Sequence, residues 1–240
     1  MQNRTARTRE HREARMKEAA AHAPHPNALL SKFLPKGASV ATARQDGLSA
    51  GICASHKLAR TDLPRLLKHQ SAFEAAALKH GLPPALLAAL ASRESRAGAL
   101  LDNNGLVGGG ECFGLMQLDS RYRPRGGAHS AEHIDHAAQV LARLLGEVKA
   151  MHPGWPAEQQ LRGAVVAYDS GVGHVRTIRD MDRGTTGDDY SNDVWARAQA
   201  LVPHFGGMEG ASANGEVPGT SLEPMGFALP RSHSRVTGRA

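Results

Sequence analysis

Glu94 and Asp119 are the residues of this chain whose types and setting best suit acid chemistry. Leu87 and Leu90 precede Glu94 at helical spacing in a segment that starts at Pro84, so Glu94 is predicted to point along the buried face of a helix. Apolar surroundings raise the pKa of a carboxyl group, as a general acid requires. A glycine-rich stretch then leads to Asp119. An acid that faces a carboxylate across a loop is the arrangement used in glycoside hydrolysis.

A structural role is open for both carboxylates. Glu94 lies close to Arg93 and Arg96 and could form a solvated ion pair with either. Asp119 could be a turn or capping residue. Spacing alone does not decide between catalysis and these roles.

Four longer motifs occur in one order along the chain: SRESRAG, FGLMQLD, AYDSGVGHVR and MDRGTTGDDYSNDVWARAQ. Together they resemble the goose-type lysozyme family, over about residues 47–206. The resemblance implies an α+β, mainly α-helical lysozyme-like fold with a small antiparallel β-sheet lining the cleft. It also implies hydrolysis of the β-1,4 bond between N-acetylmuramic acid and N-acetylglucosamine in bacterial peptidoglycan, with no cofactor.

The same resemblance suggests roles for the two carboxylates. The family's acid corresponds to Glu94, and the aspartate that positions a water corresponds to Asp119, which implies inversion. An inverting pair lies about 6.5 to 9.5 Å apart so that a water fits between the carboxyl groups. Many members carry a further aspartate where this chain has Gly108, and Glu111 or Asp102 could replace it.

Four further residues are candidates for sugar contacts on the pattern of the resembled families. They are Tyr168, Asp169, Tyr190 and Asn192. Asp169 stands where an asparagine is commoner, and a carboxylate only accepts hydrogen bonds where an amide also donates them. Core packing of Tyr168 explains that residue equally well, and capping or packing remains open for Tyr190 and Asn192.

Composition limits the class of protein. At 240 residues the chain has room for one domain with tails, and no apolar run is long enough to span a bilayer. The net charge of +6 favours an anionic partner, either a bacterial envelope or nucleic acid. Two cysteines, Cys53 and Cys112, are too few for a disulfide framework and could be paired or reduced. We expect a monomer.

Apolar periodicity predicts the helices that surround Glu94. His129, His133 and His136 cluster where one of them starts, but without a paired carboxylate motif we expect solvent-facing histidines and no metal site. Asp188 or Asp189 is the expected cap of the closing helix. The first two predicted helices cover residues 62–80 and a segment that starts at Pro84 and stops at Gly98. Further helices are predicted over residues 130–151, over residues 156–168, after Gly173, and in a closing segment that ends at about residue 206.

The ends of the chain differ from its middle in composition. We expect residues 1–46 to be a basic, disordered extension, residues 47–206 the catalytic domain, and residues 207–240 a disordered tail rich in Gly, Ser and Pro. No apolar core of an export signal follows the basic N-terminal residues. A protein that acts on the cell wall would then be exported without such a signal, or stay in the cytoplasm until release.

Two other functions remain open. A lytic transglycosylase uses one catalytic glutamate and leaves anhydro-sugar ends, so it needs no carboxylate such as Asp119. A non-catalytic glycan- or nucleic-acid-binding protein fits the basic charge, but the sequence contains no recognised nucleic-acid-binding motif or aromatic platform. We therefore expect no nucleic-acid partner.

Overall fold

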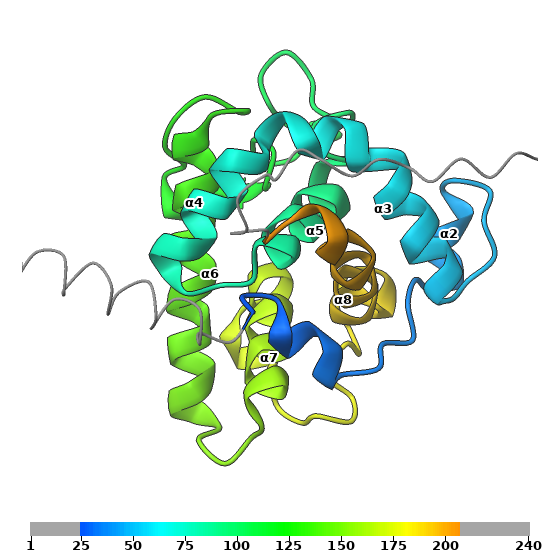
Figure 1. The fold of residues 1–240 in the computed structure, drawn as a ribbon, viewed down its shortest axis with the longest axis vertical. Coiled ribbons are helices and arrows are strands. Elements are labelled where there is room, and N and C mark those ends of the chain that lie inside the picture. The colour runs from blue at the N-terminus through cyan, green and yellow to red at the C-terminus, as the bar shows by residue number, and fades with distance from the viewer. Residues whose placement is uncertain (1–24, 207–240) are drawn as a thin grey trace, which may run out of the picture. The chain divides into compact units, whose positions relative to one another are not determined.

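The computed structural model describes residues 25–206, which form a mainly helical fold (Figure 1). These residues also contain one small antiparallel sheet. The predicted fold class is confirmed. No helix within this range is both long and apolar enough to cross a membrane. With η marking a 3₁₀ helix, the elements are η1 (Ala28–Lys32), α2 (Val40–Arg44), α3 (Ile52–Leu66), η2 (Leu67–His69), α4 (Gln70–His80), α5 (Pro84–Ser95), β1 (Cys112–Phe113), β2 (Leu118–Asp119), η3 (Ser120–Tyr122), α6 (Ala131–Met151), α7 (Ala157–Ser170), η4 (Val172–His174), η5 (Thr186–Asp188), α8 (Tyr190–Leu201) and η6 (Val202–His204).

Helix α5 is the central helix and carries Glu94 in its last turn. It begins at Pro84, as predicted, because a proline in the first helical turn gives up no hydrogen bond. Its residues 84–92 are all buried, and it packs against α3, α4 and α8 (Figure 1). A helix that is apolar on all sides belongs in the core, and this one holds Glu94 at the edge of that core.

The predicted stop of this helix at Gly98 is wrong. Helix α5 ends at Ser95, since Arg96 and Ala97 both adopt left-handed backbone conformations with φ near 53°. The N–H of Ala97 caps the helix by donating to the carbonyl of Ala91 at 2.9 Å. The Arg96 side chain is held by the buried carboxylate of Asp62, with Nε 3.0 Å from Oδ2. Side-chain anchoring thus stabilises a conformation usually left to glycine.

The single helix predicted over residues 62–80 is two helices. Helix α3 runs to Leu66, a 3₁₀ turn follows, and α4 starts at Gln70. Pro64 lies inside α3, near its end, where a proline removes one hydrogen bond and crowds the preceding turn. The apolar spacing continued through this break and concealed it.

The sheet consists of two short strands joined by a tight turn. Cys112 pairs with Asp119 and Phe113 with Leu118, in antiparallel register. Gly114 begins the turn with φ of +76°, and a Cβ there would lie 2.5 Å from the ring of His133. The turn therefore needs glycine for both its conformation and its contact with α6.

Helices α6 and α7 lie close to their predicted positions. Helix α6 spans Ala131–Met151, and the hydroxyl of Ser130 caps it by accepting from the N–H of His133 at 3.1 Å. Helix α7 spans Ala157–Ser170 after Pro156. The further helix expected after Gly173 is absent from the described residues there, which form only the 3₁₀ turn η4.

The closing helix α8 is capped differently from our expectation. Asp189 does occupy the N-cap position, but its side chain makes no cap and instead accepts from the N–H of Ser39 at 2.5 Å. Asp182 receives the N–H of Ser191 at 2.6 Å and that of Asn192 at 3.2 Å. Asp188 ends the preceding turn η5.

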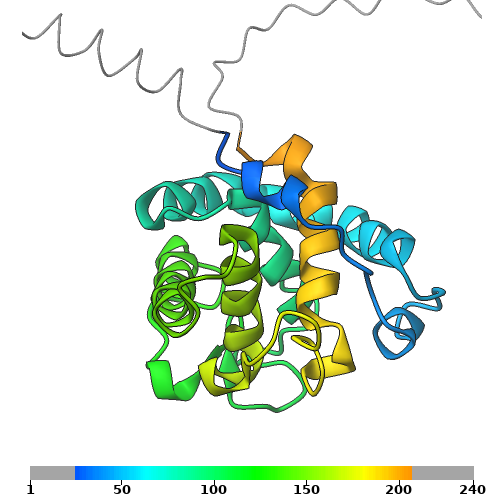
Figure 2. The same cartoon turned by 90° about the horizontal axis from the view of Figure 1, so that it is seen from below.

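The folded part starts before the predicted boundary at Gly47. Residues 25–46 include η1 and α2, and Leu30 in η1 is only 1% exposed. The indole N–H of Trp195 donates to the Leu30 carbonyl at 2.9 Å, so η1 lies against α8 (Figure 2). The prediction of a disordered extension is wrong for residues 25–46, because they complete the core. Residues 1–24 and 207–240 lie outside the described residues.

Candidate active site

Glu94 is partly buried at the end of α5, and its carboxyl group is held by α8. The hydroxyl of Tyr190, the first residue of α8, donates a hydrogen bond to Glu94 Oε1. The pKa of Glu94 is raised to about 7, mainly by burial and also by the negative charge of Asp169. The Tyr190 hydrogen bond and the positive charge of Arg93 act in the opposite direction. Near neutral pH, Glu94 can therefore both hold and release a proton.

Asp119 lies at the end of β2, with its side chain 37% exposed. Its Oδ1 accepts from the backbone N–H of Arg121 at 2.8 Å, and its Oδ2 lies 3.3 Å from Arg121 Nε. Asp119 also borders a small cleft of about 50 Å³. The cleft is lined by Cys112, Gln117, Leu118, Asp119, Arg121, Tyr122, Tyr168 and Asp169.

Cys112 lies near both predicted carboxylates, Glu94 and Asp119. It pairs with Asp119 in the sheet and lines the cleft. Burial raises the pKa of its thiol, and the negative charges of Asp119 and Glu94 raise it further, so both carboxylates lie near this thiol. The fold brings Glu94 and Asp119 to one region although they belong to different elements. Cys112 and Cys53 are both free thiols, so they form no disulfide with each other.

Tyr168 and Asp169 reach the same cleft from the end of α7. The Tyr168 hydroxyl donates to the carbonyl of Met116 at 2.7 Å, which attaches α7 to the turn of the sheet. Asp169 Oδ2 accepts from the Ser170 hydroxyl at 2.6 Å and from the Thr186 N–H at 3.1 Å. Both predicted residues therefore line the cleft, and both also tie neighbouring segments together.

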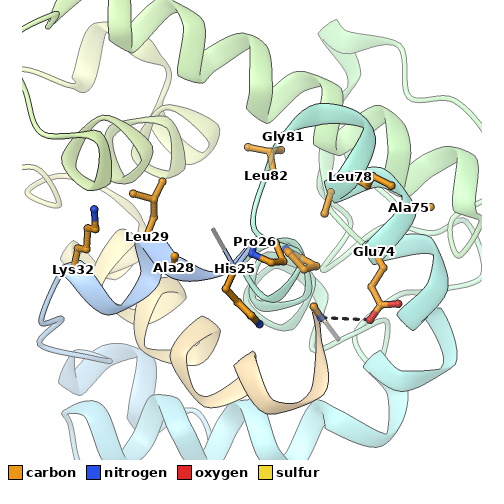
Figure 3. Close-up of a pocket in the computed structure, with 13 residues that line it drawn as sticks. His25, Pro26, Ala28, Leu29, Lys32, Glu74, Ala75, Leu78, Gly81 and Leu82 are labelled. Carbon is orange, nitrogen blue, oxygen red and sulfur yellow. Dashed lines mark hydrogen bonds between the residues drawn. The ribbon is translucent and has the colours of Figure 1, made fainter. Parts of the chain in front are cut away.

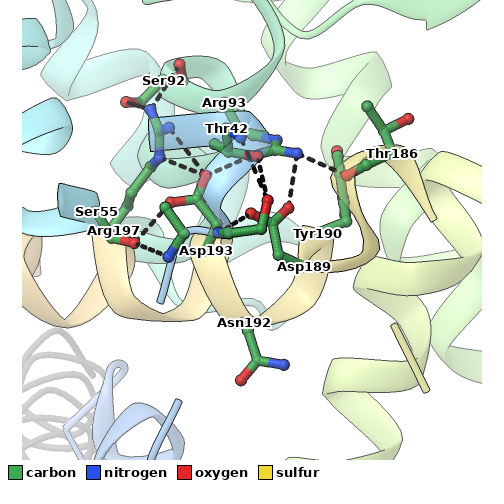
Figure 4. Close-up of polar contacts among 12 residues, drawn as sticks. Thr42, Ser55, Ser92, Arg93, Thr186, Asp189, Tyr190, Asn192, Asp193 and Arg197 are labelled. Carbon is green, nitrogen blue, oxygen red and sulfur yellow. Dashed lines mark hydrogen bonds and ion pairs between the residues drawn. The ribbon is translucent and has the colours of Figure 1, made fainter. Parts of the chain in front are cut away.

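Tyr190 and Asn192, predicted as a pair, lie in different surroundings. Tyr190 is 1% exposed and contacts Glu94, so it positions the carboxyl group. Asn192 points away from the Arg93 cluster in Figure 4. Its Oδ1 accepts from the Lys36 N–H at 2.7 Å, and its amide donates to Asp182. Asn192 therefore fastens the N-terminal segment to α8, and the structure does not bring it to the cleft.

The residues beside Glu94 that sequence reasoning missed form a buried charge cluster, shown in Figure 4. Arg93 pairs with Asp189 at 3.0 Å and with Asp193 at 2.7 Å, and its guanidinium group lies 5.4 Å from the centre of the Tyr190 ring. Arg197 also binds Asp193, at 2.9 Å. The spacing of Asp189, Asp193 and Arg197 along one helix face was the available signal. Arg93, the neighbour that might have paired with Glu94, is thus bound to α8.

The two proposed replacements for the family's further carboxylate lie away from the cleft lining. Asp102 Oδ1 accepts from the N–H groups of Asn104 and Leu106 at 2.8 and 2.9 Å, so it braces its own loop. Glu111 is exposed and lies close enough to Cys112 for its charge to raise the pKa of the thiol. Gly108 is also exposed, with φ of +60°.

The histidine cluster at the start of α6 is partly buried, contrary to our expectation. His133 is 0% and His136 8% exposed, whereas His129 is exposed. His133 Nε2 accepts from the N–H of Met116 at 3.2 Å, and burial lowers its pKa to about 4. The His133 ring packs against the turn of the sheet, whereas His136 Nδ1 accepts from the N–H of Arg125 at 3.3 Å. Residues 25–206 contain no group of three potential metal-binding side chains.

A larger cavity than this cleft lies elsewhere and contains none of the predicted site residues. It measures about 630 Å³ and lies among η1, α4 and the start of α5 (Figure 3). Its lining is mostly apolar, with His25, Lys32 and Glu74 as its titratable side chains. A choice by size would therefore favour a cavity that contains none of the predicted carboxylates, whereas Asp119 and Asp169 line the smaller cleft.

The chain is similar in sequence to known proteins. The family model described as Lysozyme g matches residues 30–204. Lysozyme g of Epinephelus coioides is 43% identical over 176 residues, which cover 68% of this chain and 90% of that protein. Lysozyme g of Takifugu rubripes is 40% identical over 189 residues, covering 75% and 99%. A glycine, glutamate and proline-rich protein of Lottia gigantea is 47% identical over 184 residues, which cover 73% of this chain but 44% of that protein. The chain belongs to the goose-type lysozyme family and is a glycoside hydrolase.

Proposed function

We propose that this enzyme hydrolyses the β-1,4 bond between N-acetylmuramic acid and N-acetylglucosamine of bacterial peptidoglycan, with inversion at the anomeric carbon. The observation that carries the proposal is the placement of the buried Glu94 carboxyl group, held by Tyr190, near a cleft that contains Asp119, and its raised pKa of about 7 agrees with this placement. A carboxylic acid that stays protonated near neutral pH can donate its proton to a glycosidic oxygen.

Glu94 acts as the general acid. Burial keeps a large share of the group protonated near neutral pH, and the Tyr190 hydroxyl fixes the orientation of its carboxyl. As the bond between the anomeric carbon and the bridging oxygen breaks, the proton moves from Glu94 to that oxygen. Glu94 is then a carboxylate, stabilised by the hydrogen bond from Tyr190 and by the nearby charge of Arg93.

Asp119 positions the attacking water on the other face of the sugar. Its exposed carboxylate borders a cleft of about 50 Å³, which is large enough to hold a water molecule. The water oxygen forms the new bond to the anomeric carbon, and its proton passes to the carboxylate. Attack from the face opposite the leaving group gives the inverted configuration.

The products of a peptidoglycan digest test this function. Mass spectrometry should detect muramic acid with reducing ends, each one water heavier than the corresponding anhydro-sugar. Anhydro-muramic ends would instead identify a lytic transglycosylase. Release of no soluble sugar by wild-type protein would favour a glycan-binding protein without activity. Glu94→Gln provides the matched blank, since the amide keeps the shape of the side chain but carries no acidic proton.

A further inference from the structure

The cleft beside Glu94 contains a second carboxylate in addition to Asp119. Asp119 and Asp169 both line it, one from β2 and the other from α7. Asp169 is also close enough to Glu94 for its charge to raise the pKa of that group. The cleft of about 50 Å³ thus has a carboxylate from each of two separate elements and room for a water molecule.

We propose that Asp169 acts with Asp119 as the second water-holding carboxylate of this enzyme, in place of the aspartate absent at position 108. The inference rests on the proposed hydrolytic function and names an additional catalytic residue for it. Asp169 and Asp119 would hold one water between them. When that water attacks the anomeric carbon, one of the two carboxylates accepts its proton, while Glu94 protonates the leaving oxygen.

The hydrogen bonds of Asp169 leave one oxygen available for this role. Its Oδ2 accepts from Ser170 at 2.6 Å and from the Thr186 N–H at 3.1 Å. Its Oδ1 accepts no hydrogen bond from any of residues 25–206. The two bonds to Oδ2 fix the carboxylate, and Oδ1 remains free to accept from a bound water.

The chemistry distinguishes an aspartate from an asparagine at this position. An amide can orient a water or a sugar hydroxyl, but it cannot accept a proton at neutral pH, whereas a carboxylate can. The negative charge of Asp169 also helps to keep Glu94 protonated. Asp169 would therefore have two effects: its charge raises the pKa of Glu94, and its carboxylate accepts a hydrogen bond from the water.

The other candidates for the second carboxylate are placed less well. Asp102 uses one oxygen for two N–H groups of its own loop. Glu111 is exposed and does not line the cleft. Asp169 is the remaining carboxylate on the cleft wall with Asp119 among the described residues.

The test uses Asp169→Asn with defined peptidoglycan oligosaccharides as substrate. We expect kcat to fall by at least about tenfold, part of the roughly 10²- to 10⁴-fold typical of general acid–base catalysis, with KM changing less than about threefold. Asp135→Asn is the matched control, because it makes the same substitution at a carboxylate that pairs with Lys79 and His80 and does not line the cleft. That variant should retain a kcat within about threefold of wild type, since an exposed ion pair contributes little.

Azide separates a catalytic carboxylate from a structural one. In Asp169→Ala, the lost carboxylate leaves space for the azide anion, which attacks the anomeric carbon without a base. We expect added azide to raise the rate and to give a glycosyl azide of inverted configuration. A raised KM with unchanged kcat in Asp169→Asn would assign Asp169 to sugar binding and overturn the proposal. A slow Asp169→Ala that azide does not accelerate would also overturn it.

Failure of this inference can be told apart from failure of the proposed function. If wild-type protein releases reducing ends, Glu94→Gln does not, and Asp169→Asn matches wild type, only the role of Asp169 is wrong. If wild-type protein gives anhydro ends or no product, the hydrolytic function is wrong, and the inference fails with it.

Discussion

The hydroxyl group of Tyr190 donates a hydrogen bond to Oε1 of Glu94, joining the first residue of α8 to the last turn of α5. This hydrogen bond stabilises the charged form of Glu94 and so lowers its pKa, whereas burial raises that pKa. Arg93 lies over the Tyr190 ring and is itself bound by Asp189 and Asp193 (Figure 4). The charge cluster therefore holds Arg93 against Tyr190, and Tyr190 in turn orients the carboxyl group of Glu94.

Replacing Tyr190 by phenylalanine should move the alkaline limb of the pH–rate profile to higher pH. The variant loses the hydrogen bond that lowers the pKa of Glu94, so the acid stays protonated to a pH above about 7. Asp169, whose charge raises this pKa, and Arg93, whose charge lowers it, remain in place. The measurement is kcat/KM against pH.

Tyr168→Phe is the control for that variant. The hydroxyl of Tyr168 donates to the Met116 carbonyl and not to Glu94, so its loss should cost about 1 kcal/mol of stability and leave the alkaline limb unmoved. Equal shifts in both variants would show that Tyr190 acts through general loosening of the site.

Glu94→Gln should stabilise the protein, and more so at alkaline pH. The pKa of Glu94 rises from 4.5 to about 7 on folding, so the folded state binds more protons between these values and wild-type stability falls as pH rises through them. The glutamine variant does not lose stability in this way. The difference between its free energy of unfolding and that of wild type should therefore grow by up to about 3 kcal/mol between about pH 4 and pH 8. Denaturant titration at both pH values measures it. An advantage that does not change with pH would contradict a raised pKa.

Asp193→Ala should destabilise the fold strongly. Asp193 is 0% exposed and binds both Arg93 and Arg197, so its removal leaves two buried cations without that partner. A loss of about 3–5 kcal/mol is expected in denaturant titration. Glu147→Ala breaks the exposed pair with Arg143 and should cost less than about 1 kcal/mol. Similar losses in the two variants would show that the buried cluster does not stabilise the site.

Asp119→Asn should lower kcat without unfolding the protein. The Asp119 side chain is partly exposed and, within residues 25–206, accepts only from Arg121, so an amide can keep the backbone contact but cannot take a proton from water. We expect a fall of at least about tenfold in kcat, with little change in melting temperature. An unchanged rate would remove Asp119 from the water position.

Local patterns in the sequence were enough to predict the helices that carry the site. Pro84 and the apolar stripe before Glu94 predicted the start and the buried face of α5, and Ser130 marks the start of α6. These features depend on neighbours a few residues apart, which the sequence displays directly.

Contacts between distant residues could not be predicted in this way. Tyr190 and Glu94 lie 96 positions apart, and only the packing of α5 on α8 brings them together. Asp182 receives the first N–H groups of α8 from outside the helix, so no capping pattern reveals it. Leu30 lies in a 3₁₀ turn too short to show periodicity, and its burial follows from the contact with Trp195.

The rate at which Glu94→Gln hydrolyses purified peptidoglycan tests the central claim most directly. At about pH 6, below the pKa of Glu94, the wild-type acid is mostly protonated, and the amide has no acidic proton to donate. Glu111→Gln, which changes an exposed carboxylate nearby, serves as the matched control and should keep nearly the full rate. We predict that Glu94→Gln loses about 10²- to 10⁴-fold in kcat. A folded Glu94→Gln variant with a rate within about threefold of wild type would contradict the assignment of Glu94 as the acid.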